Sequence, residues 1–156
     1  MKRLGYENGA IDEVDRELLS LLHENARQSV ADLARKVSLS SPSVSERVKR
    51  LEEAGVIKQY TVSIDPQALG LTIAAWLRVR PIPGKMQKVI QIIQNLPEIV
   101  ECDRITGEDC FIAKAHVPSM DDLAALIDEL VPYSMTNTSI IQSSPVARRA
   151  PYILTI

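Results

Sequence analysis

Two short amphipathic helices in succession, within residues 29–64, limit the fold of this chain more than any other feature. Ser29 is a good N-cap, and Asp32 follows at the spacing of a capping box. The apolar residues of this first helix recur at helical spacing and are Leu33, Ala34 and Val37. Residues 38–40 interrupt the pattern, so we expect a tight turn there.

The second helix is predicted to begin at Ser41, because Pro42 then lies in the first turn, where its missing N–H costs nothing. Its apolar stripe consists of Val44, Val48 and Leu51, and Gly55 marks its end. The polar residues outside this stripe, which we predict to contact DNA, are Ser41, Ser43, Ser45, Glu46, Arg47, Lys49 and Arg50.

A tight turn between two short helices can place the second helix in the major groove of DNA. Hydroxyl groups near its N-terminus can approach base edges, and basic side chains farther along can reach guanine edges or phosphates. The alternative is a helical hairpin with a solvated charged face, since Glu52 and Glu53 follow the basic residues directly. The formal net charge of −2 argues against charge-driven binding by the whole chain, so a local patch must make any DNA contact.

The neighbouring segments complete a predicted DNA-binding domain at residues 1–65. Residues 1–10 are polar and are expected to form a loose arm. Asp12 is expected to cap a supporting helix that runs to about Ala26. Residues 56–64 alternate and are rich in β-formers, which predicts a wing or a linking strand.

Residues 66–156 form the second predicted domain. Its strands are expected at Thr72–Val79, Ile99–Ile105, Cys110–Val117 and Thr138–Ser143. Helices are predicted from Met86 and after the N-cap Ser119, which gives the order β-α-β-β-α-β of a ferredoxin-like domain. The fold class is therefore α+β, a winged helix-turn-helix followed by a ferredoxin-like domain. Its helices cover one sheet face, so we expect a second copy on the other, and residues 152–156 would add an edge strand or contact a neighbour.

Motifs typical of enzymes do not occur in the sequence. There is no phosphate loop, no Gly-x-Ser-x-Gly, no His-Glu-x-x-His and no Cys-x-x-Cys. His23 and His116 form no metal-binding pattern, so we expect neither enzymatic activity nor a cofactor or metal. No signal peptide or membrane-length apolar run is present, which predicts a cytoplasmic protein without membrane contact.

These patterns leave three functions open. The first is a transcription regulator that responds to a small molecule, and the second is an architectural protein that wraps DNA without an effector. The third is a small-molecule-binding or interaction module whose helical domain contacts protein. An amino acid that changes DNA affinity or assembly would separate the first function from the second, and a lack of DNA affinity would support the third.

Several short runs occur in a specific order between about Ile11 and Ser143. Those in the first half are Asp12-x-x-Asp15-x-x-Leu18-Leu19, Asn25-Ala26-Arg27, Asp32-Leu33-Ala34 and Arg47-Val48-x-x-Leu51-Glu52-x-x-Gly55-Val56-Ile57. Those in the second half are Thr106-Gly107-Glu108-Asp109 and Thr136-Asn137-Thr138-Ser139-Ile140-Ile141. Together with the order of the strands, this set resembles the Lrp/AsnC family, also called the feast/famine regulators.

The resemblance implies a sequence-specific regulator that binds double-stranded DNA as a dimer, assembles further into tetramers or octamers, and responds to an amino acid or related small molecule. By match to the family pattern, the effector residues would be Thr106, Gly107, Asp109, Thr136 and Thr138. Asp109 can accept hydrogen bonds from an ammonium group, and Gly107 lets backbone N–H groups approach a carboxylate. The threonine hydroxyls can complete the shell. By pattern alone, residues 106–109 would be a hairpin turn.

Overall fold

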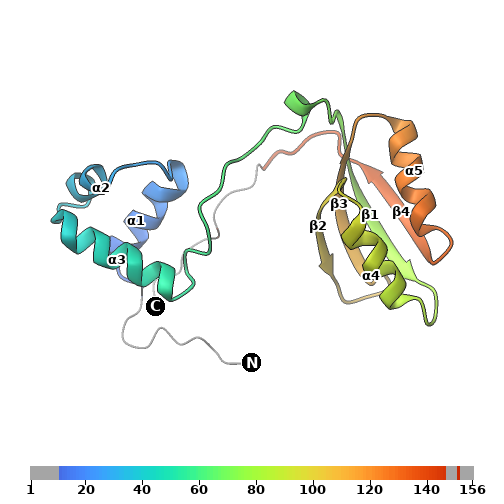
Figure 1. The fold of residues 1–156 in the computed structure, drawn as a ribbon, viewed down its shortest axis with the longest axis horizontal. Helices are drawn as coiled ribbons and strands as arrows, with labels where there is room; N and C mark the ends of the chain where they lie inside the picture. The colour runs from blue at the N-terminus through green and yellow to red at the C-terminus, as the bar shows by residue number, and fades with distance from the viewer. Residues whose placement is uncertain (1–10, 147–150, 152–156) are drawn as a thin grey trace. The chain divides into compact units, whose positions relative to one another are not determined.

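The computed structural model of the chain describes residues 11–146 and Pro151 (Figure 1). Two compact units divide the chain between Ser63 and Ile64, and Pro151 groups with the first of them. We describe each unit by itself. The predicted arm at residues 1–10 and the predicted edge strand at residues 152–156 lie outside the described residues.

The first unit contains the three predicted helices, α1 (Glu13–Glu24), α2 (Val30–Lys36) and α3 (Ser41–Glu53). Each begins after a side-chain cap. The backbone N–H of Asp15 donates to Asp12 at 2.8 Å in a capping box. At the starts of α2 and α3, the hydroxyls of Ser29 and Ser40 accept from the backbone N–H groups of Asp32 and Ser43. The apolar stripes of the helices meet in a core of Leu18, Leu33, Ala34, Val37 and Val44.

The turn between α2 and α3 confirms the predicted helix-turn-helix. Ser38 adopts a positive φ of 55°, and the N–H of Leu39 donates to the carbonyl of Ala34 at 3.0 Å. Pro42 lies in the first turn of α3, as expected. After α3, Gly55 has a φ of 70°, a conformation that ends the helix without the strain a side chain would bring.

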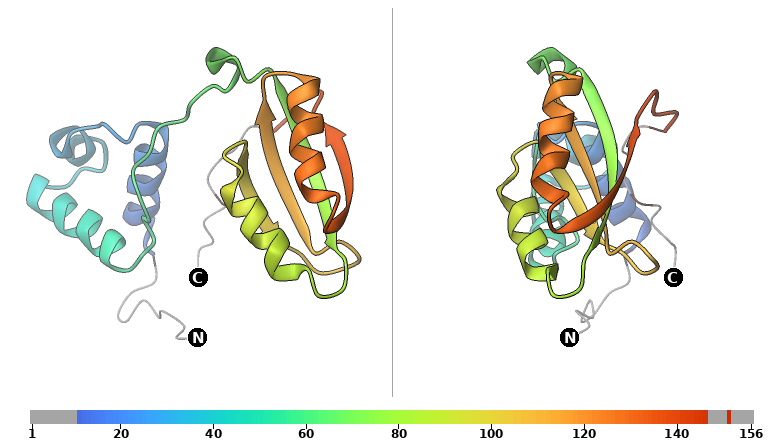
Figure 2. Two further views of the ribbon diagram at one scale, coloured as in Figure 1. Left: turned by 45° about the vertical axis from the view of Figure 1, so that its right-hand side comes forward. Right: turned by 90° about the vertical axis from the view of Figure 1, so that its right-hand side faces the viewer.

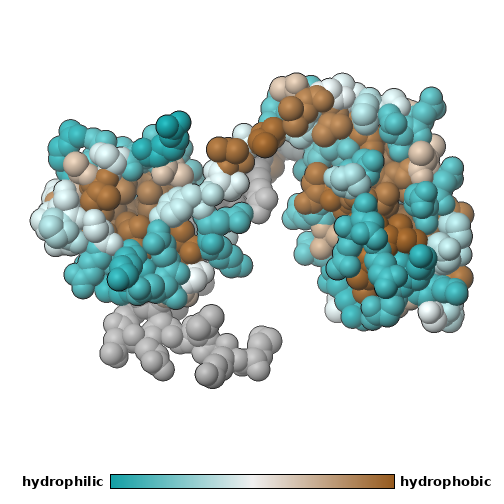
Figure 3. All heavy atoms as spheres, viewed as in Figure 1, coloured by the Kyte–Doolittle hydropathy of each residue, from teal (hydrophilic) through white to brown (hydrophobic). Residues whose placement is uncertain are grey.

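The segment after α3 is not a strand in the described chain, so the β conformation predicted for residues 56–64 is not formed. The backbone N–H groups of Val56 and Ile57 donate to the carbonyl of Leu51 at 2.9 and 3.1 Å, which holds these two residues against the end of α3. Beyond them the chain is extended, but no described segment lies beside it to form a ladder of hydrogen bonds. Val62 and Ile64 are instead 74% and 63% exposed. Hydrophobic surface is visible in this connecting segment (Figure 3).

The second unit contains a short 3₁₀ turn (Gln67–Leu69) before its first strand and is ferredoxin-like, as predicted. Its elements, in chain order, are β1 (Ile73–Pro81), α4 (Met86–Asn95), β2 (Ile99–Arg104), β3 (Phe111–Val117), α5 (Met120–Leu130) and β4 (Ser134–Ile140). The strands form an antiparallel sheet in the order β2-β3-β1-β4. Both helices lie on the same face of the sheet (Figure 2).

Alternation along the central strands separates the two sheet faces. Ala75, Leu77 and Val79 of β1 are fully buried beneath the helices. Trp76 and Arg78 point to the other face, and Lys114 of β3 lies 5.7 Å from the centre of the Trp76 ring. That face thus carries an aromatic side chain without a covering layer from the described part of the unit.

The last strand begins at Ser134, four positions before the predicted start at Thr138. Polar residues at its beginning concealed it. The hydroxyl of buried Ser134 donates to the carbonyl of Leu130 at 2.8 Å, so the polar atom is satisfied inside the core. None of the described helices combines the length and the apolarity that would be needed to cross a membrane.

Candidate nucleic-acid interface and effector site

Helix α3 presents a polar face opposite its buried stripe. Val44 and Leu51 are fully buried against the other helices. The exposed members of the predicted DNA-binding set are Ser41, Ser43, Ser45, Glu46, Lys49 and Arg50, whereas Arg47 is half-buried. Near its N-terminus the hydroxyls of Ser40 and Ser43 lie 2.8 Å apart, and Lys49 lies 3.7 Å from Glu53 on the next turn. This face offers hydroxyl groups and one ammonium group to a ligand that approaches α3 from outside.

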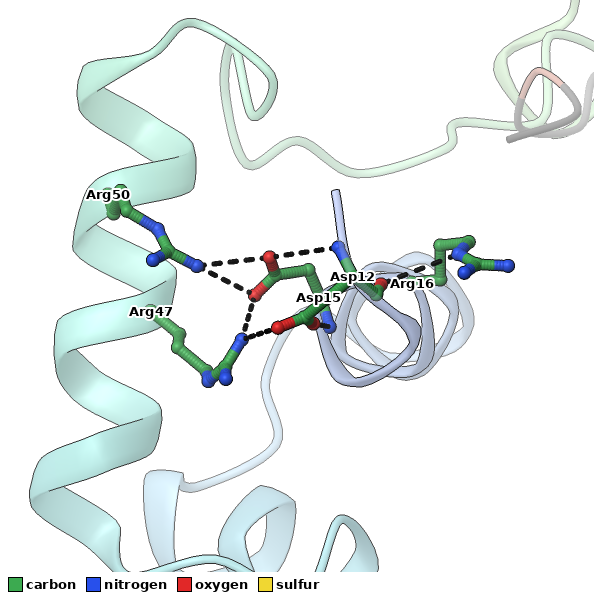
Figure 4. Close-up of polar contacts among 5 residues, drawn as sticks. All are labelled: Asp12, Asp15, Arg16, Arg47 and Arg50. Carbon is green, nitrogen blue, oxygen red and sulfur yellow. Dashed lines mark hydrogen bonds and ion pairs between the residues drawn. The ribbon is translucent and has the colours of Figure 1, made fainter. Parts of the chain in front are cut away.

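Arg47 and Arg50 point the other way, toward α1 (Figure 4). Arg47 donates to Asp12 at 2.6 Å and to Asp15 at 2.8 Å. Arg50 donates to both carboxylate oxygens of Asp15, at 3.0 and 3.2 Å. The Asp15 side chain is completely buried, whereas those of Arg47 and Arg50 are 26% and 49% exposed. These charge-assisted hydrogen bonds fix the angle of α3 on α1.

Asp15 is the functional residue that the helix patterns missed. It accompanies the apolar stripe of α1, three positions before Leu18, so helical geometry turns its side chain toward the core. A carboxylate there needs partners, because an unpaired buried charge is strongly unfavourable. An aspartate at a position that helical spacing places on the apolar side of a helix was the signal that could have predicted an ion pair between helices.

The pKa of Asp12 predicts how the first unit responds to acid. The backbone N–H of Asp15, and then the Arg47 side chain, hold the pKa of Asp12 below its ordinary value of 3.8. A depressed carboxylate pKa stabilises the fold above the ordinary value, and this stability is lost as the pH falls through the folded-state pKa. We expect Asp12→Asn, which preserves the cap, to weaken the loss of stability below pH 3.8, measured by urea unfolding at several pH values. Parallel curves for the two proteins would contradict this expectation.

The predicted effector residues gather at one end of the sheet, on either side of β1. Thr136 lies opposite Val79, and Thr138 lies opposite Leu77, in the β1–β4 register. The N–H of Cys110 donates to the Val79 carbonyl at 3.1 Å from the other side, which brings the 105–110 loop to the same end. Strand β1 therefore lies between the threonines and the loop, and neighbouring strands are about 4.8 Å apart.

The 105–110 loop is open and held at its base. The N–H of Ile105 donates to the Cys110 carbonyl at 2.9 Å, and Arg80 of β1 bonds Glu108 at 2.7 Å. Gly107 has a φ of 113°, which disfavours any side chain, and no atom lies within 4 Å of the place a Cβ would occupy. Thr106 and Gly107 are exposed and Asp109 is half-buried. Within one chain the loop is therefore a surface rather than an enclosed pocket.

The described side chains form neither a metal site nor a disulfide. No group of three or more His, Cys, Asp or Glu residues among them could hold a metal ion. The two cysteines, Cys102 and Cys110, are both free.

Two family models match the two units. A winged helix-turn-helix DNA-binding model matches residues 11–58, and a model of the Lrp/AsnC ligand binding domain matches residues 74–151. The first match covers α1, α2 and α3. The second covers β1 from its second residue, the other three strands and both helices of this unit.

Known proteins resemble the chain along most of its length. The HTH-type transcriptional regulator LrpC of Bacillus subtilis is 35% identical, over 85% of this chain and 92% of the relative. The solved structure of B. subtilis LrpC has a TM-score of 0.85 at 34% identity, over 90% of this chain and 100% of that one. A feast or famine regulatory protein from Mycobacterium tuberculosis, complexed with L-methionine, has a TM-score of 0.83 at 27% identity, over 93% and 100% of the two chains.

Proposed function

This chain belongs to the Lrp/AsnC family of DNA-binding transcriptional regulators, and we propose that it couples sequence-specific DNA binding to an amino acid or related effector. Residues 1–65 would bind DNA, and residues 66–156 would bind the effector and assemble the oligomer. We propose that the protein acts as a regulator in the cytoplasm and not as an enzyme.

The DNA-binding part of the proposal rests on one observation. Helix α3 exposes a polar face, and ion pairs to α1 hold this helix in place. Ser41, Ser43 and Ser45 supply hydroxyls to base edges or phosphates, and Lys49 supplies a charge. Glu46 can accept from the amino group of cytosine. Arg47 and Arg50 mainly position α3, and any DNA contact that they make adds to that role.

The effector part rests on the loop at residues 105–110 and on the neighbouring β4. Asp109 would accept from the ammonium group of an amino acid, while backbone N–H groups near Gly107 would receive its carboxylate. Thr136 and Thr138 would supply hydroxyl groups from across β1. Support comes from the ligand-binding family model and from the related M. tuberculosis protein, which was solved with L-methionine.

Assembly would complete the effector site. The loop is open within one chain, and the sheet face with Trp76 and Arg78 has no helix over it (Figure 2). We propose that a second copy packs on this face and that further contacts enclose the loop. An effector between subunits can then shift assembly, and with it the spacing of the α3 helices, only by its different affinity for the alternative states.

Footprinting tests the whole proposal. DNA upstream of the protein's own gene would be probed with and without a mixture of amino acids. We expect protection at sites spaced by about one helical turn of DNA, with a pattern that the mixture alters. Protection that no amino acid changes would support the architectural alternative, and a lack of DNA affinity in a genome-wide selection would refute the regulatory role.

Replacing Asp109 by Ala tests the effector site separately. We expect the variant to lose the response to the amino acid and to bind DNA like the parent in its absence, because Asp109 belongs to the second unit. Band-shift titration over a range of effector concentrations measures both. Asp128→Ala, at an exposed position of α5, is the matched control and should respond normally. A normal response by the Asp109 variant would exclude this residue from the site.

A further inference from the structure

A groove on the first unit takes no part in the function proposed above. It encloses about 1090 Å³ between α1 and the segment that follows α3. Its apolar walls are formed mainly by Leu19, Leu22, Ala26, Val56, Ile57 and Tyr60. Tyr60 is fixed there by a 2.7 Å hydrogen bond from its hydroxyl to Glu52. Burial and this contact raise the pKa of Tyr60 to about 12.

The walls are suited to an apolar peptide segment. Among the described lining residues none is acidic, and the basic Arg16 and His23 lie beside the apolar ones. The lining runs from Ile11 to Ala26, the full length of α1. A helix of 12 residues such as α1 is about 18 Å long. Five extended residues span about 17 Å, so a short extended segment has the length to fill the groove from end to end.

One residue that lines the groove, Pro151, shows that the C-terminal part of the chain lies next to it. Pro151 lines the groove, whereas every other lining residue in the described part of the chain lies between Ile11 and Thr61. The residues after Pro151 in the sequence are Tyr152, Ile153, Leu154, Thr155 and Ile156, of which only Thr155 is not hydrophobic. Proline favours extended backbone before it and supplies no N–H that would favour a helix.

The geometry points to residues 152–156 of the same chain as the occupant of this groove. Their apolar side chains would cover exposed walls of α1 and of residues 56–61, and such burial is the main favourable term in docking. The segment begins at a wall that Pro151 already forms, so little chain entropy is lost on closing the short connection.

Docking of residues 152–156 would connect β4, which carries two of the proposed effector residues, to α1, the helix that supports α3. Thr136 and Thr138 lie on β4, and the chain continues from β4 toward Pro151 without another described helix or strand. Helix α1 forms one wall of the groove and also carries Asp15, which holds Arg47 and Arg50. The segment would thus give the second unit a connection to α1 that is separate from residues 56–64.

Hydrogen exchange of the full chain, compared with a chain that lacks residues 152–156, tests the docking. We expect the deletion to raise amide exchange by about tenfold in peptides that cover α1 and residues 56–61. Peptides from β3 should exchange as before. Unchanged exchange in α1, or an equal rise in β3, would overturn the inference.

Point variants separate the groove from a general effect of deletion. Leu154→Asp should reproduce the deletion, and Leu154→Met should not, because only the first brings a charge to an apolar wall. From the other side, Ala26→Asp should also reproduce it, whereas Ala31→Asp, at an exposed alanine of α2 outside the groove, should have no effect. Protection that falls when the protein is diluted until its oligomers dissociate would overturn the assignment to the chain's own segment.

Discussion

Replacing Asp15 by Ala is expected to destabilise the first unit by about 1.5–3 kcal/mol and to abolish DNA binding. Asp15 is completely buried and bonds both Arg47 and Arg50. Its removal leaves two guanidinium groups at the α1–α3 boundary without their shared carboxylate. Losing these bonds costs more than losing an exposed ion pair, because the Asp15 carboxylate is buried and accepts from both arginines.

The expected loss is confined to the first unit. Chemical unfolding, followed by hydrogen exchange for each unit separately, should show α1 and α3 opening while the four-stranded sheet of the second unit keeps its protection. Asp12→Asn is the matched control. It removes a charge that also bonds Arg47 but is 46% exposed, so the change should be no more than about 1 kcal/mol. Equal losses from the two substitutions would show that burial of Asp15 does not govern the stability of the first unit.

Reversing the charge of Lys49 is expected to have the second large effect. Lys49→Glu should weaken DNA binding by about tenfold or more, because it removes a cation and adds an anion on the proposed contact face. Stability should change little, since Lys49 is exposed and makes only a surface contact of 3.7 Å with Glu53. DNA titration at several salt concentrations provides the measurement, and the salt dependence of binding should become shallower.

The matched control for Lys49 changes net charge by the same amount elsewhere. Lys85→Glu alters an exposed residue just before α4 in the second unit. Its DNA affinity should stay within about twofold of the parent, because Lys85 belongs to the second unit and lies outside the proposed contact face of α3. Similar losses from both variants would mean that the charge of the whole chain, rather than the face of α3, determines binding.

Features with a short reach along the chain could be predicted from the sequence. Asp12, Ser29 and Ser119 cap helices where the residue types predict caps. The strand and helix order of the second unit likewise follows from apolar spacing within each segment. The exposed serines and Lys49 of α3 could be proposed as DNA contacts because a single helix's periodicity separates its buried stripe from its outer face.

The positions of Arg47 and Arg50 depended on contacts between distant parts of the chain. Their type and their place on α3 suggested DNA, yet their side chains bond Asp15, which lies 32 and 35 positions earlier. Residues 56–64 alternate like a strand and have no described partner to pair with. Caps and stripes act over three or four residues and can be seen in the sequence, whereas ion pairs and strand pairing require two distant segments to meet. The sequence by itself determined the helices and their order, and packing of α1 against α3 decided which charges face inward.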